Sequence, residues 1–254
     1  MTDKLRRAFI AASPSPGARV DLDPEESHHV ARVLRLKPRE ALQVFDGTGG
    51  AWEATIDEVS RDRVSVVIGA GLTMDVEPAL RVVVYQALVR PEKFEWVLQK
   101  GTEIGVAAFR LVGSQRVEAP PPSPARLTRY HRIVMEACKQ CGRLRLPAVL
   151  VSPIDTPPSD VVAIVLATGA GVPSIGTVVC GPAAPEVWIA VGPEGGFTDG
   201  ELDGLKARGW RAASLGPRVL RTETAGAVAA AIVLHTWGDL GPPSARPPGS
   251  PSPG

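Results

Sequence analysis

Two glycine-rich segments hold the residues whose types and spacing could do chemistry. The first, AVGPEGGFTDGEL at residues 190–202, follows the apolar run at residues 187–189. The second, SLGPRVLRTETA at residues 214–225, follows the next strand-like stretch. Glycine has no Cβ, so two such backbones can approach a ligand closely without side chains in the way. The pair therefore predicts a binding site built from two neighbouring strand ends.

The first segment does not have the pattern of a phosphate-binding loop. A P-loop needs Gly-x-x-x-x-Gly-Lys-Ser/Thr, and a dinucleotide turn needs Gly-x-Gly-x-x-Gly. Residues 190–202 contain neither motif, and Glu194 stands where a phosphate loop would carry lysine. Because a carboxylate repels a phosphate anion, a phosphate cradle is not expected here. The turn is predicted to hold a different kind of ligand.

The second segment supplies side chains that could take part in a reaction. Arg218 and Arg221 flank Val219 and Leu220, and Glu223 follows in the first turn of an expected helix. An arginine can stabilise negative charge that develops on an oxygen, and a carboxylate can orient it or accept a proton. Arg221 and Glu223 could equally well pair with each other to fasten the turn. Both interpretations stay open at this point.

Other chemistry-bearing patterns are weaker. Cys138 and Cys141 form a C-x-x-C near a predicted helix end, with Cys180 the only further cysteine. Zinc would need two more ligands, and redox pairs normally sit at a helix start, so we expect two thiols without metal or redox chemistry. His28 and His29 point about 100° apart on a helix, so they cannot share one small site. Three cysteines make no disulfide framework, which favours a reducing compartment.

Residues 1–74 are predicted to form a β-rich unit with one helix. Asp23, Pro24 and Glu26 have the spacing of a helix start, with a cap, a proline at the first position and an acid three residues after the cap. Alternating apolar and polar residues then predict a meander of strands that closes into a small barrel. The expected strands cover residues 41–47, 51–59 and 64–70.

From about residue 80 the pattern changes to strands that alternate with helices, which predicts an α/β fold with a parallel sheet covered on both faces. Strands are expected at residues 81–89, 107–114, 161–168, 186–192 and 211–216. Helices are expected from Pro91, over 125–142, from the capping box at 198–201, and over 222–240. Four prolines predict an extended linker from Ala119 to Arg126, and six predict a disordered tail at 241–254.

Composition favours an ordinary soluble chain. It has 254 residues, 44% hydrophobic content and a formal net charge of +1. No apolar run approaches the roughly 18 residues of a membrane-spanning helix, and no signal peptide is recognisable, so we expect a cytoplasmic protein. Charge is locally uneven, because residues 126–145 contain six Arg or Lys against the single acid Glu136. That density suits a nucleic-acid backbone, although a solvated helix face would have the same composition.

Five ordered motifs resemble one family closely. They are residues 191–196 with Glu201 beyond, and the stretches 215–225, 29–35, 93–105 and 136–143. Together they are similar to the RsmE family of 16S ribosomal RNA uridine N3-methyltransferases, over roughly residues 5–240. The sequence differs from the family pattern at three places. They are the proline-rich segment after Arg116, the position of Tyr130 or His131, where the family commonly has tryptophan, and the loop 168–171.

The resemblance implies a fold, a cofactor and partners. It implies a PUA-like β-barrel domain at 1–74, a SPOUT α/β methyltransferase domain with a trefoil knot at 75–240, and a proline-rich tail at 241–254. S-adenosylmethionine would be the cofactor, and 16S rRNA or the small ribosomal subunit would be the partner. The protein would form a homodimer and would bind neither a metal nor a membrane. Two other activities stay open: methylation of tRNA or of a ribose hydroxyl by another SPOUT enzyme, and RNA binding without catalysis.

The resemblance also implies roles for individual residues. Direct transfer to N3 would be assisted by Arg221 or Arg218, with Glu223 to orient the arginine or accept the proton, whereas Lys100 and Glu103 would be structural or interface residues. The implied cofactor-binding residues are Leu166, Ala167, Thr168, Gly169, Gly192, Pro193, Glu194, Gly195, Gly196, Leu215, Gly216, Val219 and Leu220. The implied RNA-binding residues are Arg32, Arg35, Arg116, Lys139, Arg143 and Arg145.

Overall fold

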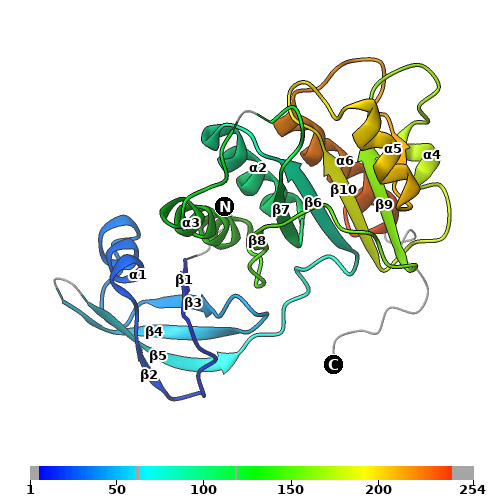
Figure 1. Cartoon of the computed structure of the whole chain (residues 1–254). Helices are drawn as coiled ribbons and strands as arrows, with labels where there is room; N and C mark the ends of the chain where they lie inside the picture. The colour runs from blue at the N-terminus through cyan, green and yellow to red at the C-terminus, as the bar shows by residue number, and fades with distance from the viewer. Residues whose placement is uncertain (1–5, 61–62, 118, 242–254) are drawn as a thin grey trace. The chain divides into compact units, whose positions relative to one another are not determined.

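The computed structural model describes residues 6–60, 63–117 and 119–241 (Figure 1). It divides into two compact units, Met1–Glu77 with Met135–Leu146, and Pro78–Val134 with Pro147–Gly254. The domain boundaries expected at residues 74, 75 and 240 stay predictions. The tail expected to be disordered lies outside the described residues from 242 onward. None of the described helices is long and apolar enough to cross a membrane.

The first unit is built on a five-stranded sheet with the order β1-β3-β4-β5-β2. Strands β3, β4, β5 and β2 pair antiparallel in that order, whereas β1 runs parallel to β3. The strands are β1 Arg7–Phe9, β2 Arg19–Asp21, β3 Ala41–Phe45, β4 Ala51–Val59 and β5 Val64–Gly71. The expected meander is therefore present, and β1 and β2, which were not expected, lie at its two ends.

A short helical segment between β2 and β3 matches the predicted helix start. Helix α1, Pro24–His28, is capped by Asp23, whose side chain accepts a hydrogen bond from the backbone N–H of Glu26. It continues as a π-helical turn, η1, His29–Val33. Val30 from this turn is fully buried in a core with strand residues such as Val44 and Val66. The predicted cap thus places an apolar residue against the sheet.

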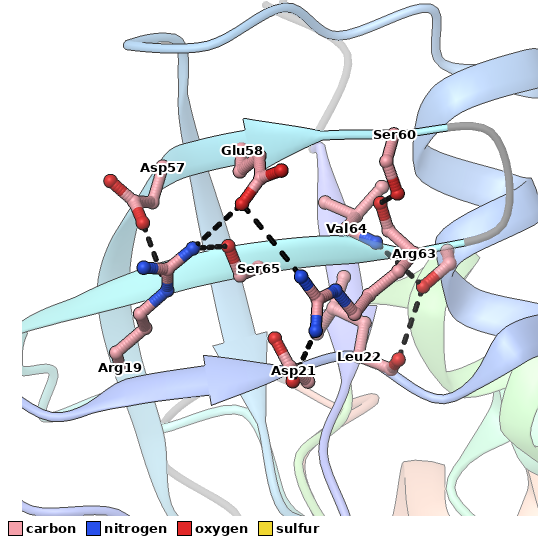
Figure 2. Close-up of polar contacts among 10 residues, drawn as sticks. Arg19, Asp21, Leu22, Asp57, Glu58, Ser60, Arg63, Val64 and Ser65 are labelled. Atoms are coloured by element: carbon pink, nitrogen blue, oxygen red, sulfur yellow. Dashed lines mark hydrogen bonds and ion pairs between the residues drawn. The ribbon is translucent and has the colours of Figure 1, made fainter.

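The edge strand β2 is held by ion pairs as well as by its backbone ladder (Figure 2). Arg19 reaches Asp57 and Glu58 on β4, across the intervening strand β5. Arg63 pairs with Asp21 on β2, at 3.6 Å. These charges are about half exposed, so each pair adds little stability. Their effect is to mark the outer edge of the sheet with charged side chains, which disfavours pairing with another strand.

The second unit contains a six-stranded sheet in which every pairing is parallel, with the order β11-β9-β10-β6-β7-β8. This confirms the α/β class with a parallel sheet. The strands are β6 Arg81–Ala87, β7 Ala108–Val112, β8 Ala148–Val151, β9 Val161–Leu166, β10 Glu186–Val191 and β11 Arg211–Ala213. The helices are α2 Pro91–Ile104, α3 Pro124–Cys141, α4 Ile175–Val178, α5 Asp199–Ala207 and α6 Thr222–Trp237.

Alternate residues of β6 show that helices cover both faces of this sheet. Tyr85 lies in one apolar cluster with Leu205 of α5 and Trp210. Val84 and Gln86 point the other way, because a Cβ added to Gly226 of α6 would lie 3.6 Å from each of their side chains. Successive strand residues face opposite sides. Helix α5 therefore covers one face, and α6, which packs on α2, covers the other.

One element boundary corrects the sequence prediction. The segment from Ala119 to Arg126 was expected to be an extended linker and the next helix to cover 125–142, whereas α3 begins one residue earlier, at Pro124, and includes the last three residues of that segment. Pro124 is the first helical residue, where its fixed φ and missing N–H are well tolerated. The backbone N–H of Leu127 bonds the carbonyl of Ser123 at 3.0 Å, which starts the helix there. Two short elements, β8 and α4, were also missed.

The C-terminal end of α3 belongs to the first unit and carries buried charge. Lys139, whose side chain is 5% exposed, lies 2.5 Å from Glu26, whose side chain is 0% exposed. Glu136 on the same helix lies 2.5 Å from the same ammonium. Nearby, Arg143 pairs with Glu77 at 2.9 Å. Buried ions are stable only when they are paired and hydrogen-bonded, so these contacts are part of the structure of the unit.

Replacement of Lys139 by Met should therefore unfold the first unit more easily. The Glu26 carboxylate would be left buried without its cation, which costs about 3–5 kcal/mol. Chemical denaturation monitored by circular dichroism measures the loss. Arg6→Met is the matched control, because Arg6 pairs with Glu40 at an exposed site, where about 0–1 kcal/mol is expected. Equal effects of the two variants would show that Lys139 has no structural role.

Candidate functional site

A pocket of about 510 Å³ lies in the second unit at the carboxyl ends of three neighbouring strands, β9, β10 and β11. In open α/β sheets ligands bind at this edge. The three loops expected from the sequence meet here. The lining residues are Lys93, Arg116, Leu166, Ala167, Thr168, Val191, Gly192, Pro193, Glu194, Gly195, Gly196, Phe197, Asp199, Leu202, Leu215, Val219, Leu220, Arg221, Thr222 and Ala225.

A single hydroxyl joins the elements behind the pocket. Thr222 begins α6 and is buried, and its Oγ1 donates a hydrogen bond to the carbonyl of Gly192 at 2.5 Å. The same oxygen accepts one from Nε2 of Gln86, at 2.9 Å, at the end of β6. Helix α6 can come this close because Gly226 faces the strands, where a Cβ would meet Val191 at 3.3 Å. The contact fixes both loop ends relative to the sheet.

The turn Gly192–Gly196 is shaped by its glycines. A Cβ on Gly192 would lie 3.0 Å from the backbone nitrogen of Phe197, so any side chain there would force the turn open. Gly196 has φ +69°, which favours glycine. The turn ends in the predicted capping box, in which Thr198 and Glu201 bond each other's backbone. This confirms the helix start expected there.

Arg116 braces the turn from a different loop. Its guanidinium donates to the carbonyl of Gly195 at 2.6 Å. Next to it, the backbone N–H of Gln115 donates to Glu201 at 2.8 Å. Arg116 was expected to contact RNA, and the structure places it in the wall of the pocket. A guanidinium has five donor hydrogens, so Arg116 can hold the turn and still face a ligand.

The segment between β11 and α6 forms the third wall. Ser214 is held by the loop before α4, since it donates its N–H to Pro173 at 2.8 Å and accepts from Ile175 at 2.9 Å. Gly216 has φ +107°. Of the expected residues in this segment, Gly216 and Arg218 are absent from the lining, as is Gly169 in the loop after β9. Val219 is 84% exposed, so a large apolar surface faces solvent beside the pocket.

Charge in the pocket is organised by Lys93, which the sequence did not single out. Its ammonium lies 2.5 Å from Glu194 and 3.8 Å from Glu223. The hydrogen bond from Lys93 is the main reason that the pKa of Glu194 lies below its usual value. Arg221 is exposed, and no ion pair joins it to Glu223 among the described residues. The carboxylate of Glu223 is therefore directed to Lys93 instead.

The expected RNA-binding residues divide into two groups. Arg32, Arg35 and Arg145 are exposed on the first unit. Lys139 and Arg143 are buried in ion pairs, so they present no charge at the surface of that unit. The basic segment is therefore a solvated helix face only in part, because two of its cations are internal. Their burial in ion pairs does not fit the RNA contacts expected of Lys139 and Arg143.

The cysteines and histidines lie outside this pocket. Burial raises the pKa of the Cys138 thiol to about 12, which disfavours the reactive thiolate. Burial also lowers the pKa of His29 below its usual value. Within the described residues no group of three or more His, Cys, Asp or Glu is placed to hold a metal ion. Chemistry is thus concentrated at the strand-end pocket.

Comparison with known proteins shows similarity along nearly the whole chain. The model of the RNA methyltransferase domain matches residues 76–234, and that of the RNA methyltransferase PUA domain matches residues 22–69. Ribosomal RNA small subunit methyltransferase E from Synechocystis is 32% identical over 89% of this chain and 76% of its own length. The Bacillus subtilis protein of the same name is 28% identical, over 79% of this chain and 84% of its own length.

Solved structures agree with these relatives. A ribosomal RNA small subunit methyltransferase E from Neisseria gonorrhoeae, bound to S-adenosyl methionine, superposes with a TM-score of 0.85 at 32% identity, over 92% of this chain and 98% of its own. A methyltransferase from Legionella pneumophila with bound SAM gives a TM-score of 0.86 at 30% identity, over 94% of this chain and 100% of its own.

Gly195→Trp should fill the pocket and prevent its ligand from binding. A Cβ at this position already meets Arg116 at 3.3 Å, so an indole must project into the space between the loops. Calorimetry with S-adenosylmethionine measures the loss. Gly200→Trp serves as the control, because Gly200 is exposed on α5 and has open space around it. If Gly195→Trp bound the cofactor as tightly as Gly200→Trp, the turn would not belong to the binding site.

Proposed function

The chain belongs to the ribosomal RNA small subunit methyltransferase E family, and we propose that it transfers a methyl group from S-adenosylmethionine to N3 of a specific uridine in 16S rRNA. The observation that carries this proposal is the glycine-walled pocket at the ends of β9, β10 and β11. It lies in the region matched by the methyltransferase model. Its donors and charges fit this cofactor better than a phosphate ligand.

The fit rests on the chemistry of the lining. When bound, S-adenosylmethionine supplies an electrophilic methyl group on a cationic sulfonium. Glu194 is acceptable near a cation, and its pairing with Lys93 offsets part of its charge. Backbone amides and carbonyls exposed by the glycines, with an apolar wall from Leu215 and Leu220, suit a ribose and an adenine. The proposed cofactor-binding residues are Leu166, Ala167, Thr168, Gly169, Gly192, Pro193, Glu194, Gly195, Gly196, Leu215, Gly216, Val219 and Leu220.

The reaction requires that N3 of the uracil lose its proton. Negative charge then spreads over the two flanking carbonyl oxygens, and a positioned cation lowers the energy of that state. Arg221 lines the pocket and is the proposed donor. Arg218 lies two residues from the lining residue Leu220 and is a second candidate. Glu223, in the first turn of α6, is the proposed group that orients the cations or accepts the proton.

RNA would be held largely through phosphates, with the target base turned out of its strand into the pocket. The proposed contacts are Arg32 and Arg35, in the stretch that the PUA-domain model matches, Arg145 on the same unit, and Arg116 at the pocket. Arg35 has φ +56°, a conformation that is uncommon outside glycine. Backbone strain of this kind is often found at functional sites.

We further propose that the C-terminal part is tied in a SPOUT trefoil knot and that two copies form a homodimer in the cytoplasm. In support of the knot, the chain leaves β11 at the sheet edge, is strapped to the loop before α4, and returns to pack α6 on β6 and β10. In support of the dimer, Trp96 is 39% exposed on α2, which packs on α6. Four half-buried apolar residues also lie on α6: Ala227, Val228, Ala231 and Ile232.

Arg221→Ala should separate binding from chemistry. We expect cofactor affinity close to that of the unchanged protein, with methyl transfer to N3 lowered about 10²-fold or more, which is the scale for loss of one preorganised donor. The measurement pairs calorimetry with analysis of nucleosides from small-subunit RNA after reaction. Unchanged turnover would remove Arg221 from the mechanism.

The same assays distinguish the proposed activity from the alternatives. A protein that binds RNA without catalysis would bind no S-adenosylmethionine, and Gly195→Trp would not change its behaviour. A methyltransferase acting on tRNA or on a ribose hydroxyl would bind the cofactor but leave N3 of the small-subunit uridine unmodified. Appearance of 3-methyluridine in small-subunit RNA is the result that supports the proposal.

A further inference from the structure

A lysine from a separate helix faces the same pocket as Arg221. Lys93 lies in the first turn of α2, and its side chain is 24% exposed. It lines the pocket together with residues from all three strand-end loops. Helix α2 directly follows β6, the strand whose Gln86 bonds Thr222. The position of Lys93 is therefore set by the same part of the sheet that holds the pocket walls.

Two carboxylates from two different elements hold the Lys93 ammonium. Its Nζ donates a hydrogen bond to Oε1 of Glu194 at 2.5 Å and lies 3.8 Å from Oε2 of Glu223. The Glu223 side chain is 15% exposed, and its Oε2 is buried without a hydrogen-bond partner among the described residues. An ammonium carries three donor hydrogens, and only one is used by Glu194. Lys93 thus has donors to offer a ligand.

The charge balance of this cluster bears on the reaction. One ammonium between two carboxylates carries a formal net charge of about −1, which would repel a base that is becoming an anion. The repulsion is offset only if cations face the base more closely than the carboxylates do. Lys93, Arg116 and Arg221 line the pocket together with the carboxylates of Glu194 and Asp199, whereas Glu223 does not. Three cations therefore face the site against two carboxylates, and the buried carboxylate of Glu223 lies outside the lining.

We propose that Lys93 is a catalytic residue that donates a hydrogen bond to a carbonyl oxygen of the target uracil and stabilises the charge that forms there as N3 loses its proton. This inference rests on the proposed function. N3 lies between two carbonyl oxygens, so Lys93 from α2 and Arg221 from the start of α6 can each serve one of them. Glu194 and Glu223 are positioning residues that hold the ammonium.

The movement of the proton and of the electron pairs during methyl transfer shows what Lys93 contributes. The N3 proton leaves to water, the N3 electron pair forms the new bond to the methyl carbon, and the methyl–sulfur bond breaks with its electrons kept by sulfur. Lys93 itself keeps its protons throughout. Its contribution is to make the N3 anion more accessible at neutral pH, where free uridine is almost entirely protonated.

Lys93→Met tests this role, because it keeps an unbranched side chain of nearly the same length and removes the charge and its hydrogen-bond donors. Single-turnover methylation of small ribosomal subunits that lack the modification is followed from about pH 6 to about pH 9. We expect a loss of about 10²-fold near pH 7, which shrinks as the pH rises because the base then ionises without help. Lys93→Arg should recover part of the rate. Lys206→Met, which removes an ion-paired lysine from α5 outside the pocket, should change nothing.

Calorimetry with S-adenosylmethionine separates catalysis from a structural effect. If Lys93 only fastened the turn at Glu194, Lys93→Met would weaken cofactor binding and lower the rate of methyl transfer by the same factor at every pH. That result, or an unchanged rate, would overturn the inference. Failure of the proposed function would look different, because the unchanged protein would then form no 3-methyluridine at any pH.

Discussion

The hydroxyl of Thr222 is the contact on which the site depends. It donates to Gly192 at the end of β10 and accepts from Gln86 at the end of β6, and its own residue starts α6. Thr222 and Gln86 are both buried, so the Gln86 amide cannot turn to water if the bond is lost. One side chain thereby couples two strands, the glycine turn and the segment that carries Arg221. Pocket shape and the position of the reacting groups follow from the same bond.

Parallel strands and small residues make this arrangement possible. The carboxyl ends of β9, β10 and β11 lie side by side, so three loops border one space. Gly226 allows α6 to pack closely on β6 and β10, and Gly192 allows the turn to fold back on Phe197. Charge is added from outside the sheet, by Lys93 of α2 and by Arg116 of the loop after β7. The sheet sets the geometry, and these two cations add positive charge to the pocket lining.

Much of this could be predicted from the sequence, because the signals are local. The alternation of apolar stretches indicated the parallel sheet, and the Asp23 and Thr198 caps located two helix starts that the structure confirms. The two glycine-rich turns indicated the pocket walls. Short elements such as β8 and α4 were missed, since four residues show no usable periodicity. Pro124 was misassigned because a proline run masks a helix start.

Long-range contacts were beyond the sequence. Lys93 and Glu194 are about a hundred residues apart, so nothing local shows that they pair. Likewise, the charge of Lys139 suggested an RNA-binding face. In the structure Lys139 is buried in an ion pair with Glu26, which lies on a helix far away in the sequence. Spacing can identify residues able to do chemistry. Only the packing shows which of them face a ligand and which neutralise one another.

The most direct test of this account is the affinity of Thr222→Val for S-adenosylmethionine, measured by calorimetry beside Thr222→Ser. Valine keeps the shape of threonine but removes the hydroxyl that bonds the Gly192 carbonyl and the Gln86 amide, whereas serine retains it. We expect Thr222→Val to lose cofactor affinity and methyl transfer, and Thr222→Ser to keep most of both. Equal affinity of Thr222→Val and the unchanged protein would contradict it.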